Sequence, residues 1–410
     1  MDIEDQRTMQ PPSLTPHAAS PKPPFFGVYI HFPFCRAKCG YCDFASIPAC
    51  DIPHAAYADL VLSELAARAE VFADGQLRSI YFGGGTPSLW DPNQVARVVS
   101  AVLQTFAHAE SVEITLEVNP GTARQEVFQQ LAGCGVNRLS IGVQSLDDDV
   151  LRLLTRIHTR HMAQHAVADA RQAGFANINC DLMFGLPGQT VEHHLEQLQG
   201  LLELGPNHVS VYGLSLSPTA PLRLAGLAPA EDDLLADMME AGRSVLEAAG
   251  FFQYEVSNYA PHVFRSAHNA LVWAGRPYLG LGASAHSMFF AGPVTTRVIN
   301  PDLPYYLQAK NMQANTAPSF SAVGSPCAVI ETITEPTSRW ELLILGLRTV
   351  DGVDREAYRF RFGRDILDDH FGPRLNELSQ LGLVQVSEHC IAPTARGIWL
   401  ADELALRLAT

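Results

Sequence analysis

The stretch Tyr29-Ile-His-Phe-Pro-Phe-Cys35-Arg-Ala-Lys-Cys39-Gly-Tyr-Cys42-Asp-Phe44 holds three cysteines within eight residues, at the spacing Cys-x3-Cys-x2-Cys. Cysteine thiolates are the usual ligands of iron–sulfur clusters, and a [4Fe–4S] cluster normally takes four. A group of three leaves one iron without a protein ligand, and an open coordination position is where a metal site binds a small molecule. The spacing therefore predicts a [4Fe–4S] cluster held by Cys35, Cys39 and Cys42.

Two other interpretations of this stretch are structural cysteines on a loop and half of a zinc site. Zinc motifs usually show two Cys-x2-Cys pairs, or one such pair with a matching pair of histidines, and no second pair follows here. The remaining cysteines are scattered along the chain and are expected to act as small hydrophobic residues. They are Cys50, Cys134, Cys180, Cys327 and Cys390.

The cysteine stretch resembles the radical S-adenosylmethionine (SAM) superfamily, in which SAM occupies the open iron. It is most similar to the branch that holds the oxygen-independent coproporphyrinogen III oxidases and the HemW-type heme chaperones. The resemblance runs from about Tyr29 to Ser287 and continues more loosely to the C-terminus. It implies a [4Fe–4S] cluster, bound SAM and a partial (β/α)6 barrel.

Length and charge restrict the class of protein further. A chain of 410 residues favours one large domain and a smaller one. The net charge of −15 argues against extended binding to nucleic acid, which needs lysine and arginine on one face. We find neither a signal peptide pattern nor an apolar run of about 18 residues, so we expect no membrane span. A cytoplasmic protein with reduced cysteines is expected.

Apolar runs that predict strands alternate with stretches that predict helices. The expected strands are 28–32, 79–82, 113–118, 138–143, 177–183 and 208–214. The expected helices are 53–73, 91–107, 122–133, 147–173, 190–204 and 231–249. Six strands, each followed by a helix, indicate an α/β fold with a parallel sheet and right-handed crossovers. A partial (β/α)6 barrel fits this pattern, with its chemistry at the C-terminal ends of the strands.

We expect four segments along the chain. Residues 1–24 are rich in proline and are expected to be a disordered tail. Residues 25–287 form the barrel and its heme-associated extension, and 288–335 are expected to be a connecting segment. Residues 336–410 predict a small helical or winged-helix-like domain. This last segment is not basic, which favours a structural or docking role over DNA binding.

A glycine-rich segment, Gly83-Gly84-Gly85-Thr86-Pro87, directly follows the second expected strand. Glycines let the backbone approach a ligand closely and leave its N–H groups free for hydrogen bonds. On its own such a run is as often a tight turn. The resemblance implies that Gly84, Gly85 and Thr86 contact SAM, with the amino group of SAM bound here.

Four polar residues near later strand ends complete the expected SAM site. The resemblance implies that Glu117 contacts SAM, that Gln144 binds its ribose or methionine end, and that Arg156 holds its carboxylate. From the sequence alone, Glu117 could be a solvated surface residue and Arg156 a surface helix residue. Asp181 is expected to end the fifth strand and to bind ribose hydroxyls. Tyr29 and Tyr41 are expected to pack beside the cofactor, with core tyrosines as the alternative.

A histidine motif follows in Ser266-Ala-His268-Asn-Ala-Leu-Val272-Trp273. Histidine is a common axial ligand of heme iron. The chaperone branch has a His-Asn-x-x-Tyr-Trp signature tied to heme, and here Val272 replaces the tyrosine. The resemblance implies heme binding through His268 and Trp273, and the alternative is a hydrogen-bonded histidine beside a core tryptophan.

One position separates the two branches. The oxidases carry a further cysteine two residues after the third cluster cysteine, and here that position is Phe44. This favours a heme chaperone that binds heme and passes it to an acceptor protein, which the sequence does not identify; nor does it identify an electron donor. The alternative is an oxidase of porphyrin biosynthesis that decarboxylates coproporphyrinogen III with a SAM-derived radical. A radical SAM enzyme for another substrate is a third interpretation.

Overall fold

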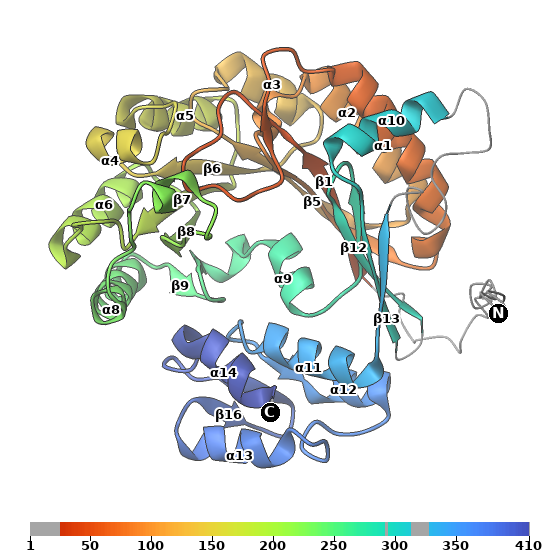
Figure 1. Cartoon of the computed structure of the whole chain (residues 1–410), viewed down its shortest axis with the longest axis vertical. Helices are drawn as coiled ribbons and strands as arrows, with labels where there is room; N and C mark the ends of the chain where they lie inside the picture. Colours follow the sequence, from red (N-terminus) through yellow and green to blue (C-terminus); the bar gives the residue numbers. More distant parts are fainter. Residues whose placement is uncertain (1–24, 292–293, 313–327, 410) are drawn as a thin grey trace, which may run out of the picture.

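The computed structural model describes residues 25–291, 294–312 and 328–409. The expected disordered tail at 1–24 and Cys327 lie outside these residues. Within them, twelve strands form one open sheet whose centre is parallel (Figure 1). The parallel strands, in spatial order, are β11 (Tyr278–Leu281), β1 (Phe25–Phe32), β4 (Gln76–Gly84), β5 (His108–Val118), β6 (Arg138–Gln144), β7 (Ile178–Phe184) and β8 (His208–Gly213).

Helices follow the parallel strands as the sequence predicts, and they cover the outer face of the curved sheet (Figure 1). They are α1 (His54–Arg68), α2 (Pro92–Thr105), α3 (Gln125–Gly133), α4 (Asp148–Leu153), α5 (Arg160–Gln172), α6 (Val191–Glu203) and α8 (Asp232–Ala248). The short helix α7 (Pro221–Leu224) instead packs against the cysteine loop, where the N–H of Leu222 donates to the carbonyl of Gly40. The α/β fold with an open, partial barrel is therefore confirmed.

One expected helix, 147–173, is in fact two. Asp147 caps the start of α4 by accepting hydrogen bonds from the backbone N–H groups of Asp149 and Val150. Thr159 caps the start of α5 in the same way. A second capping residue inside a helical stretch marks a new N-terminus, because it satisfies N–H groups that a continuous helix would bond internally. The break leaves Arg156 in a loop.

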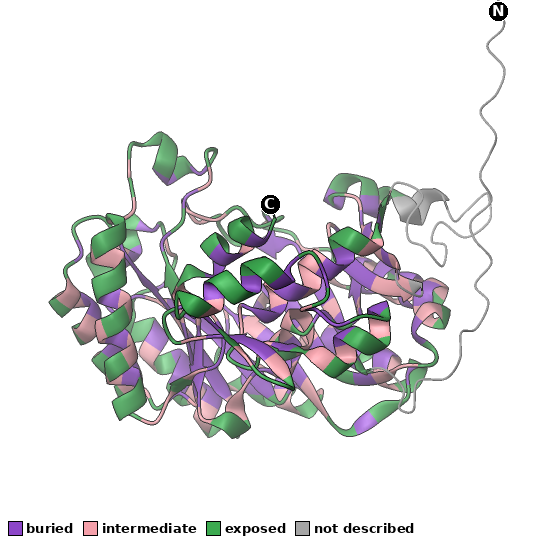
Figure 2. Ribbon diagram, turned by 90° about the horizontal axis from the view of Figure 1, so that it is seen from below, coloured by how far each residue is buried: buried purple, intermediate pink, exposed green. Residues whose placement is uncertain are grey.

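The two faces of the sheet differ in character. On β1, Val28 and Ile30 are fully buried in the core beneath the helices, and Ile80, Leu116 and Ile141 continue this layer on β4, β5 and β6. The alternate residues face the other side, and many of them are polar. Figure 2 shows the helices with buried residues on the side toward the sheet and exposed residues on the side toward solvent. The concave face thus has the polar side chains that a binding site needs.

The segment 288–335, expected to be a connection, carries strands that extend the sheet. β12 (His286–Ala291), β13 (Val294–Ile299) and β14 (Val329–Ile333) follow β11 in antiparallel order. Valine, threonine and phenylalanine favour strands, so local propensity agrees with this result. The helix α10 (Leu303–Met312) lies in the same segment. On the opposite edge, β10 (Asn258–Ala260) and β9 (Phe252–Gln253) pair antiparallel next to β8.

The C-terminal residues form the small domain that the sequence predicts, with a core of its own. Its helices are α11 (Glu335–Gly346), α12 (Arg355–Phe362), α13 (Gly372–Gln380) and α14 (Ala401–Leu408). A small antiparallel sheet joins them, in the order β15 (Val353–Asp354), β17 (Cys390–Pro393) and β16 (Val384–Val386). The helix α9 (Ala267–Trp273) lies between this domain and the main sheet (Figure 1). In the described part of the chain, no helix has the length and apolar character that crossing a membrane requires.

Candidate cluster and cofactor site

The cysteine loop leaves the C-terminal end of β1 through β2 (Phe34–Cys35), which pairs with β3 (Ile47–Pro48). Cys35 is buried, and the hydroxyl of Thr86 donates to its Sγ over 3.5 Å. A guanidinium nitrogen of Arg156 lies 3.5 Å from Sγ of Cys39. Two of the three cysteine sulfurs thus have a hydrogen-bond donor beside them. Phe44 is 60% exposed on the same loop.

The three thiols suit a cluster better than a single ion. The three thiols belong to one short loop, and burial raises the pKa of Cys42, with further contributions from Cys39 and Cys35. Within the described residues, no three histidine, cysteine or acidic side chains converge as ligands of one ion. A [4Fe–4S] cluster bonds its cysteines to different irons, so their sulfurs need not meet at one point. The residues present therefore fit the cluster.

The glycine segment after β4 packs against the backbone of the cysteine loop. The N–H of Gly85 donates to the carbonyl of Phe32 over 2.7 Å, and the N–H of Thr86 donates to that of Phe34 over 2.9 Å. The N–H of Gly84 donates to Glu117. The expectation of free N–H groups here is therefore wrong. An ammonium group needs acceptors in any case, so carbonyl oxygens of this segment and the Glu117 carboxylate suit the amino group of SAM.

The variant Gly85→Ala should destabilise the protein and prevent cluster retention. A Cβ at Gly85 would lie 2.7 Å from the carbonyl oxygen of Phe34, so the cysteine loop would have to move. Overpacking of this kind costs about 1–3 kcal/mol. Denaturant unfolding and cluster absorbance after reconstitution measure both effects. Gly133→Ala is the matched control, because its Cβ would meet nothing within 4 Å. Equal behaviour of the two variants would contradict this account.

Glu117 lies one residue before the end of β5 and is half-buried on the concave face. Its carboxylate accepts hydrogen bonds from the hydroxyl of Tyr81 over 2.9 Å and from the N–H of Gly84 over 3.1 Å. Burial raises the pKa of Glu117 to about 7, and the nearby charge of Asp181 also raises it. The alternative of a solvated surface glutamate is therefore wrong.

Gln144 and Arg156 lie together beside the cysteine loop. Gln144 ends β6 with a φ of 64°, a left-handed conformation that is uncommon for a residue with a side chain. Arg156 is half-buried, so it is not the surface helix residue that was the alternative. Its guanidinium donates to the carbonyl of Gly142 over 2.9 Å and to the hydroxyl of Tyr41 over 3.3 Å. Arg156 and Tyr41 thus link the end of β6 to the cluster loop.

Asp181 lies in the middle of β7 rather than at its end, as the fourth of seven residues. It is half-buried, accepts a hydrogen bond from the side chain of Asn179 over 2.7 Å, and burial raises its pKa. Tyr29 lies in the middle of β1, stacked on Tyr81 with ring centroids 6.1 Å apart. Its hydroxyl lies 3.1 Å from Nδ1 of His31. Both predicted residues therefore face the concave side.

Sequence reasoning missed several residues of this concave face. Strand pairing places three of them, Tyr81 on β4, Thr115 on β5 and Arg138 on β6, in one row that begins at the predicted Tyr29 on β1. The strands of a parallel sheet are usually apolar on both faces, because helices cover both. Polar residues at alternate positions of these strands were the signal that one face lines a site.

His268 and Trp273 lie on different faces of α9. His268 is 7% exposed against the main sheet, with Nδ1 2.9 Å from Oγ of Ser79 and its ring 5.0 Å from that of Tyr81. Trp273 lies near the C-terminal domain, where the guanidinium of Arg348 sits 5.4 Å above its ring. The structure therefore does not bring the two expected heme residues together, and it places only His268 at the concave face.

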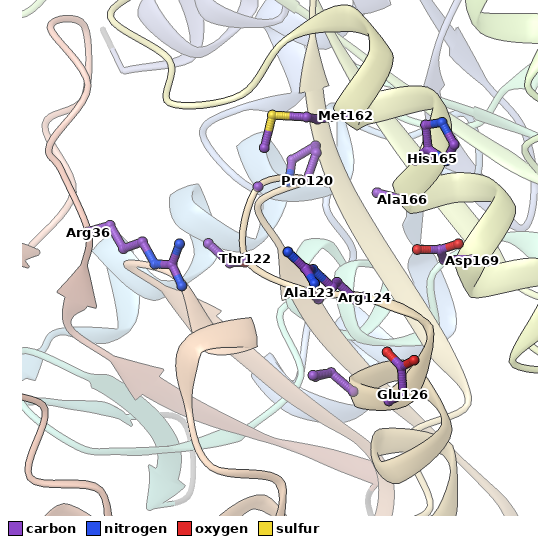
Figure 3. A pocket seen from close by; sticks show the side chains of 12 residues that line it. Arg36, Pro120, Thr122, Ala123, Arg124, Glu126, Met162, His165, Ala166 and Asp169 are labelled. Atoms are coloured by element: carbon purple, nitrogen blue, oxygen red, sulfur yellow. The ribbon is translucent and has the colours of Figure 1, made fainter.

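The structure also has a cavity of about 580 Å³ that is separate from the predicted SAM site. Arg36 of the cysteine loop extends toward it from one side, and His165 and Asp169 of α5 border it on the other (Figure 3). The turn that contains Pro120 and Thr122 lines it between these two sides (Figure 3). None of the residues predicted to bind SAM or the cluster lines this cavity.

Comparison with known proteins is consistent with this geometry. The family model of the radical SAM superfamily matches residues 29–212, and that of the HemN C-terminal domain matches 334–400. The chain is 39% identical over 282 residues to the heme chaperone HemW of Haemophilus influenzae, a match that covers 67% of this chain and 74% of the relative. It is 32% identical over 383 residues to the heme chaperone HemW of Bacillus subtilis, covering 92% and 97%.

A solved structure has the same fold over nearly the whole chain. It is that of coproporphyrinogen III oxidase (HemN) from Escherichia coli, described as a radical SAM enzyme. The TM-score is 0.76 at 25% sequence identity, and the match covers 95% of this chain and 91% of that one. The chain therefore belongs to the radical SAM superfamily and, within it, to the HemW family.

Proposed function

We propose that this protein is a heme chaperone, which binds heme and transfers it to an acceptor protein. The observation that carries the proposal is Phe44, which stands where the related oxidases have a further cysteine and is exposed on the cluster loop. The names of the HemW relatives support the same choice. We further propose that the protein acts in the cytoplasm, and we leave the acceptor and the electron donor unidentified.

The alternative is an oxygen-independent coproporphyrinogen III oxidase. The fold match to HemN favours it, since both chains share the barrel and the C-terminal domain. A shared fold does not establish a shared reaction, however, because function depends on the residues of the site. The replacement of a thiol by a phenyl ring at Phe44 is a difference of that kind, and it favours the chaperone.

Cys35, Cys39 and Cys42 would hold the [4Fe–4S] cluster, and SAM would bind beside it through residues of the glycine segment and the strand ends. These are Tyr29, Tyr41, Gly84, Gly85, Thr86, Glu117, Gln144, Arg156 and Asp181. When bound, the cluster and SAM supply one-electron chemistry. The chain itself supplies Glu117 as an acceptor for an ammonium group and Arg156 as a donor for a carboxylate.

For heme, we propose His268 as the iron ligand. Its Nδ1 is hydrogen-bonded to Ser79, which leaves Nε2 for a metal, and metal-ligating histidines commonly use the two nitrogens in this way. Burial lowers the pKa of His268 to about 3, with a further contribution from Arg138. The imidazole is therefore neutral near pH 7, as iron coordination requires. Trp273 would act at a distance from the iron.

The affinity for SAM should rise with pH between about 6 and 8. Glu117 has a pKa of about 7, so it is largely protonated at pH 6, and a protonated carboxyl attracts an ammonium group weakly. Each pH unit below the pKa should cost up to about tenfold in affinity. Calorimetric titration at several pH values measures this dependence. The variant Glu117→Gln should lose it, and an unchanged pH slope in that variant would contradict the role of Glu117.

Transfer of heme tests the proposal. Heme-loaded protein is mixed with a heme-free acceptor, such as an apo-cytochrome, and the two are separated by size. The rate of spontaneous heme dissociation is measured separately, with an excess of a heme scavenger. The proposal predicts that heme transfer to the acceptor is faster than this dissociation. Transfer at the rate of free release would show a heme-binding protein without chaperone activity.

A further inference from the structure

The concave face carries a buried arginine that forms no ion pair with any described residue. Arg138 is the first residue of β6 and is 2% exposed. Among the described residues, nothing forms an ion pair or a hydrogen bond with its guanidinium, and its Nε is enclosed without a partner. A buried guanidinium is strongly unfavourable unless an anion or several acceptors compensate for its lost hydration. No carboxylate of the described residues therefore contacts the guanidinium directly.

The carboxylates of the same face are engaged elsewhere. Glu113 accepts hydrogen bonds from backbone N–H groups at the start of α9. Glu117 accepts from Tyr81, and Asp181 accepts from Asn179. None of the three lies within ion-pair distance of Arg138, although Glu113 and Glu117 are on the adjacent strand. The charge of Arg138 partly offsets the rise in the pKa of Asp181, so the two groups are near each other, but none of the three carboxylates forms an ion pair with the guanidinium.

A second unpartnered donor lies beside Arg138. Thr115 is its partner in register on β5, and its side chain faces the same side of the sheet. Thr115 is fully buried, and its hydroxyl has no hydrogen-bond partner among the described residues. One carboxylate could accept from both the guanidinium and the hydroxyl, which would satisfy two groups that otherwise remain unpaired.

The surroundings of Arg138 connect it to the proposed heme ligand. Tyr81 is the next residue of the same row, and its ring lies against that of His268. The charge of Arg138 is also close enough to contribute to the low pKa of His268 and of His208. If His268 coordinates the iron of heme, one edge of the porphyrin ring would therefore lie near Arg138. Heme carries its carboxylates, the two propionates, at that edge.

We propose that Arg138, together with the hydroxyl of Thr115, binds a carboxylate of the ligand, and that this carboxylate is a heme propionate. The inference rests on the proposed heme binding. A carboxylate could also come from SAM, so the test separates the two sources. It compares heme with heme dimethyl ester, whose propionates are esterified and uncharged.

The experiment measures affinity for heme, for its dimethyl ester and for SAM in reconstituted full-length protein. The wild type should bind heme about ten- to a hundredfold more tightly than the ester. Arg138→Gln should bind both equally, Thr115→Val should lose part of the preference, and SAM affinity should not change. Arg152→Gln is the matched control, since Arg152 is exposed, and it should keep the full preference. Cluster absorbance reports that each variant is folded.

The outcomes distinguish failure of the inference from failure of the proposed function. Tight heme binding with the full preference for heme retained in Arg138→Gln, or in Thr115→Val if the arginine variant does not fold, would overturn the inference alone. A loss of SAM affinity with an unchanged preference would assign the site to the SAM carboxylate and would also overturn it. Absence of heme binding in the wild type would overturn both proposals.

Discussion

Replacement of Cys35, Cys39 or Cys42 by alanine should abolish the visible absorbance of the cluster after anaerobic reconstitution. Each cysteine is expected to ligate a different iron, and no fourth thiol of the sequence has a spacing that could substitute. Loss of one thiolate therefore leaves two open irons, and the cluster should not survive purification. Iron and sulfide analysis together with the absorbance spectrum measure the effect.

Cys50→Ala is the matched control for this experiment. Cys50 is an exposed free cysteine eight residues beyond Cys42, outside the Cys-x3-Cys-x2-Cys motif. It should retain the full iron content of the wild type. Full iron loading in the triple alanine variant of the motif would contradict the assignment of the cluster.

The variant His268→Ala should lose or shift the Soret band of bound heme and leave the cluster intact. The imidazole is the proposed axial ligand, and its removal changes the ligand field of the iron. The cluster should be unaffected, because His268 contacts Ser79 and Tyr81 rather than the cysteine loop. Heme titration followed by absorbance spectroscopy measures the band, and iron content before titration reports on the cluster.

Val272→Ala on the same helix provides the control for the histidine. Val272 has no polar group to offer a ligand, and the variant should keep the Soret band of the wild type. A wild-type spectrum in His268→Ala would show that another residue ligates the iron.

The parallel core of the fold could be predicted from sequence because its strands are short apolar runs separated by amphipathic helices. The strands β12 and β13 were missed because their mixed apolar and polar residues give no clear period and sit in a segment with proline and serine. The loop at Arg156 was missed for a different reason. Its signal was local, the capping residue Thr159 within a stretch that otherwise favours a helix.

The candidate site contains both residues that the sequence could predict and residues that it could not. Spacing predicted Cys35, Cys39 and Cys42 as the cluster ligands, because all three are close together in the sequence. The sequence motif did not show that His268 and Trp273 lie on different sides of α9, although residues five apart on an α-helix point about 140° from each other. Thr115 and Arg138 were missed because their significance depends on the lack of partners among the described residues, which only packing reveals.

The central claim, that the protein binds heme rather than oxidising a porphyrinogen, is tested most directly on one sample. Anaerobically reconstituted protein with SAM is divided between a heme titration and an assay with coproporphyrinogen III. The account predicts a saturable Soret band and no decarboxylated product. Conversion of coproporphyrinogen III with consumption of SAM, and no heme binding, would contradict it and would show that Phe44 does not separate the two functions.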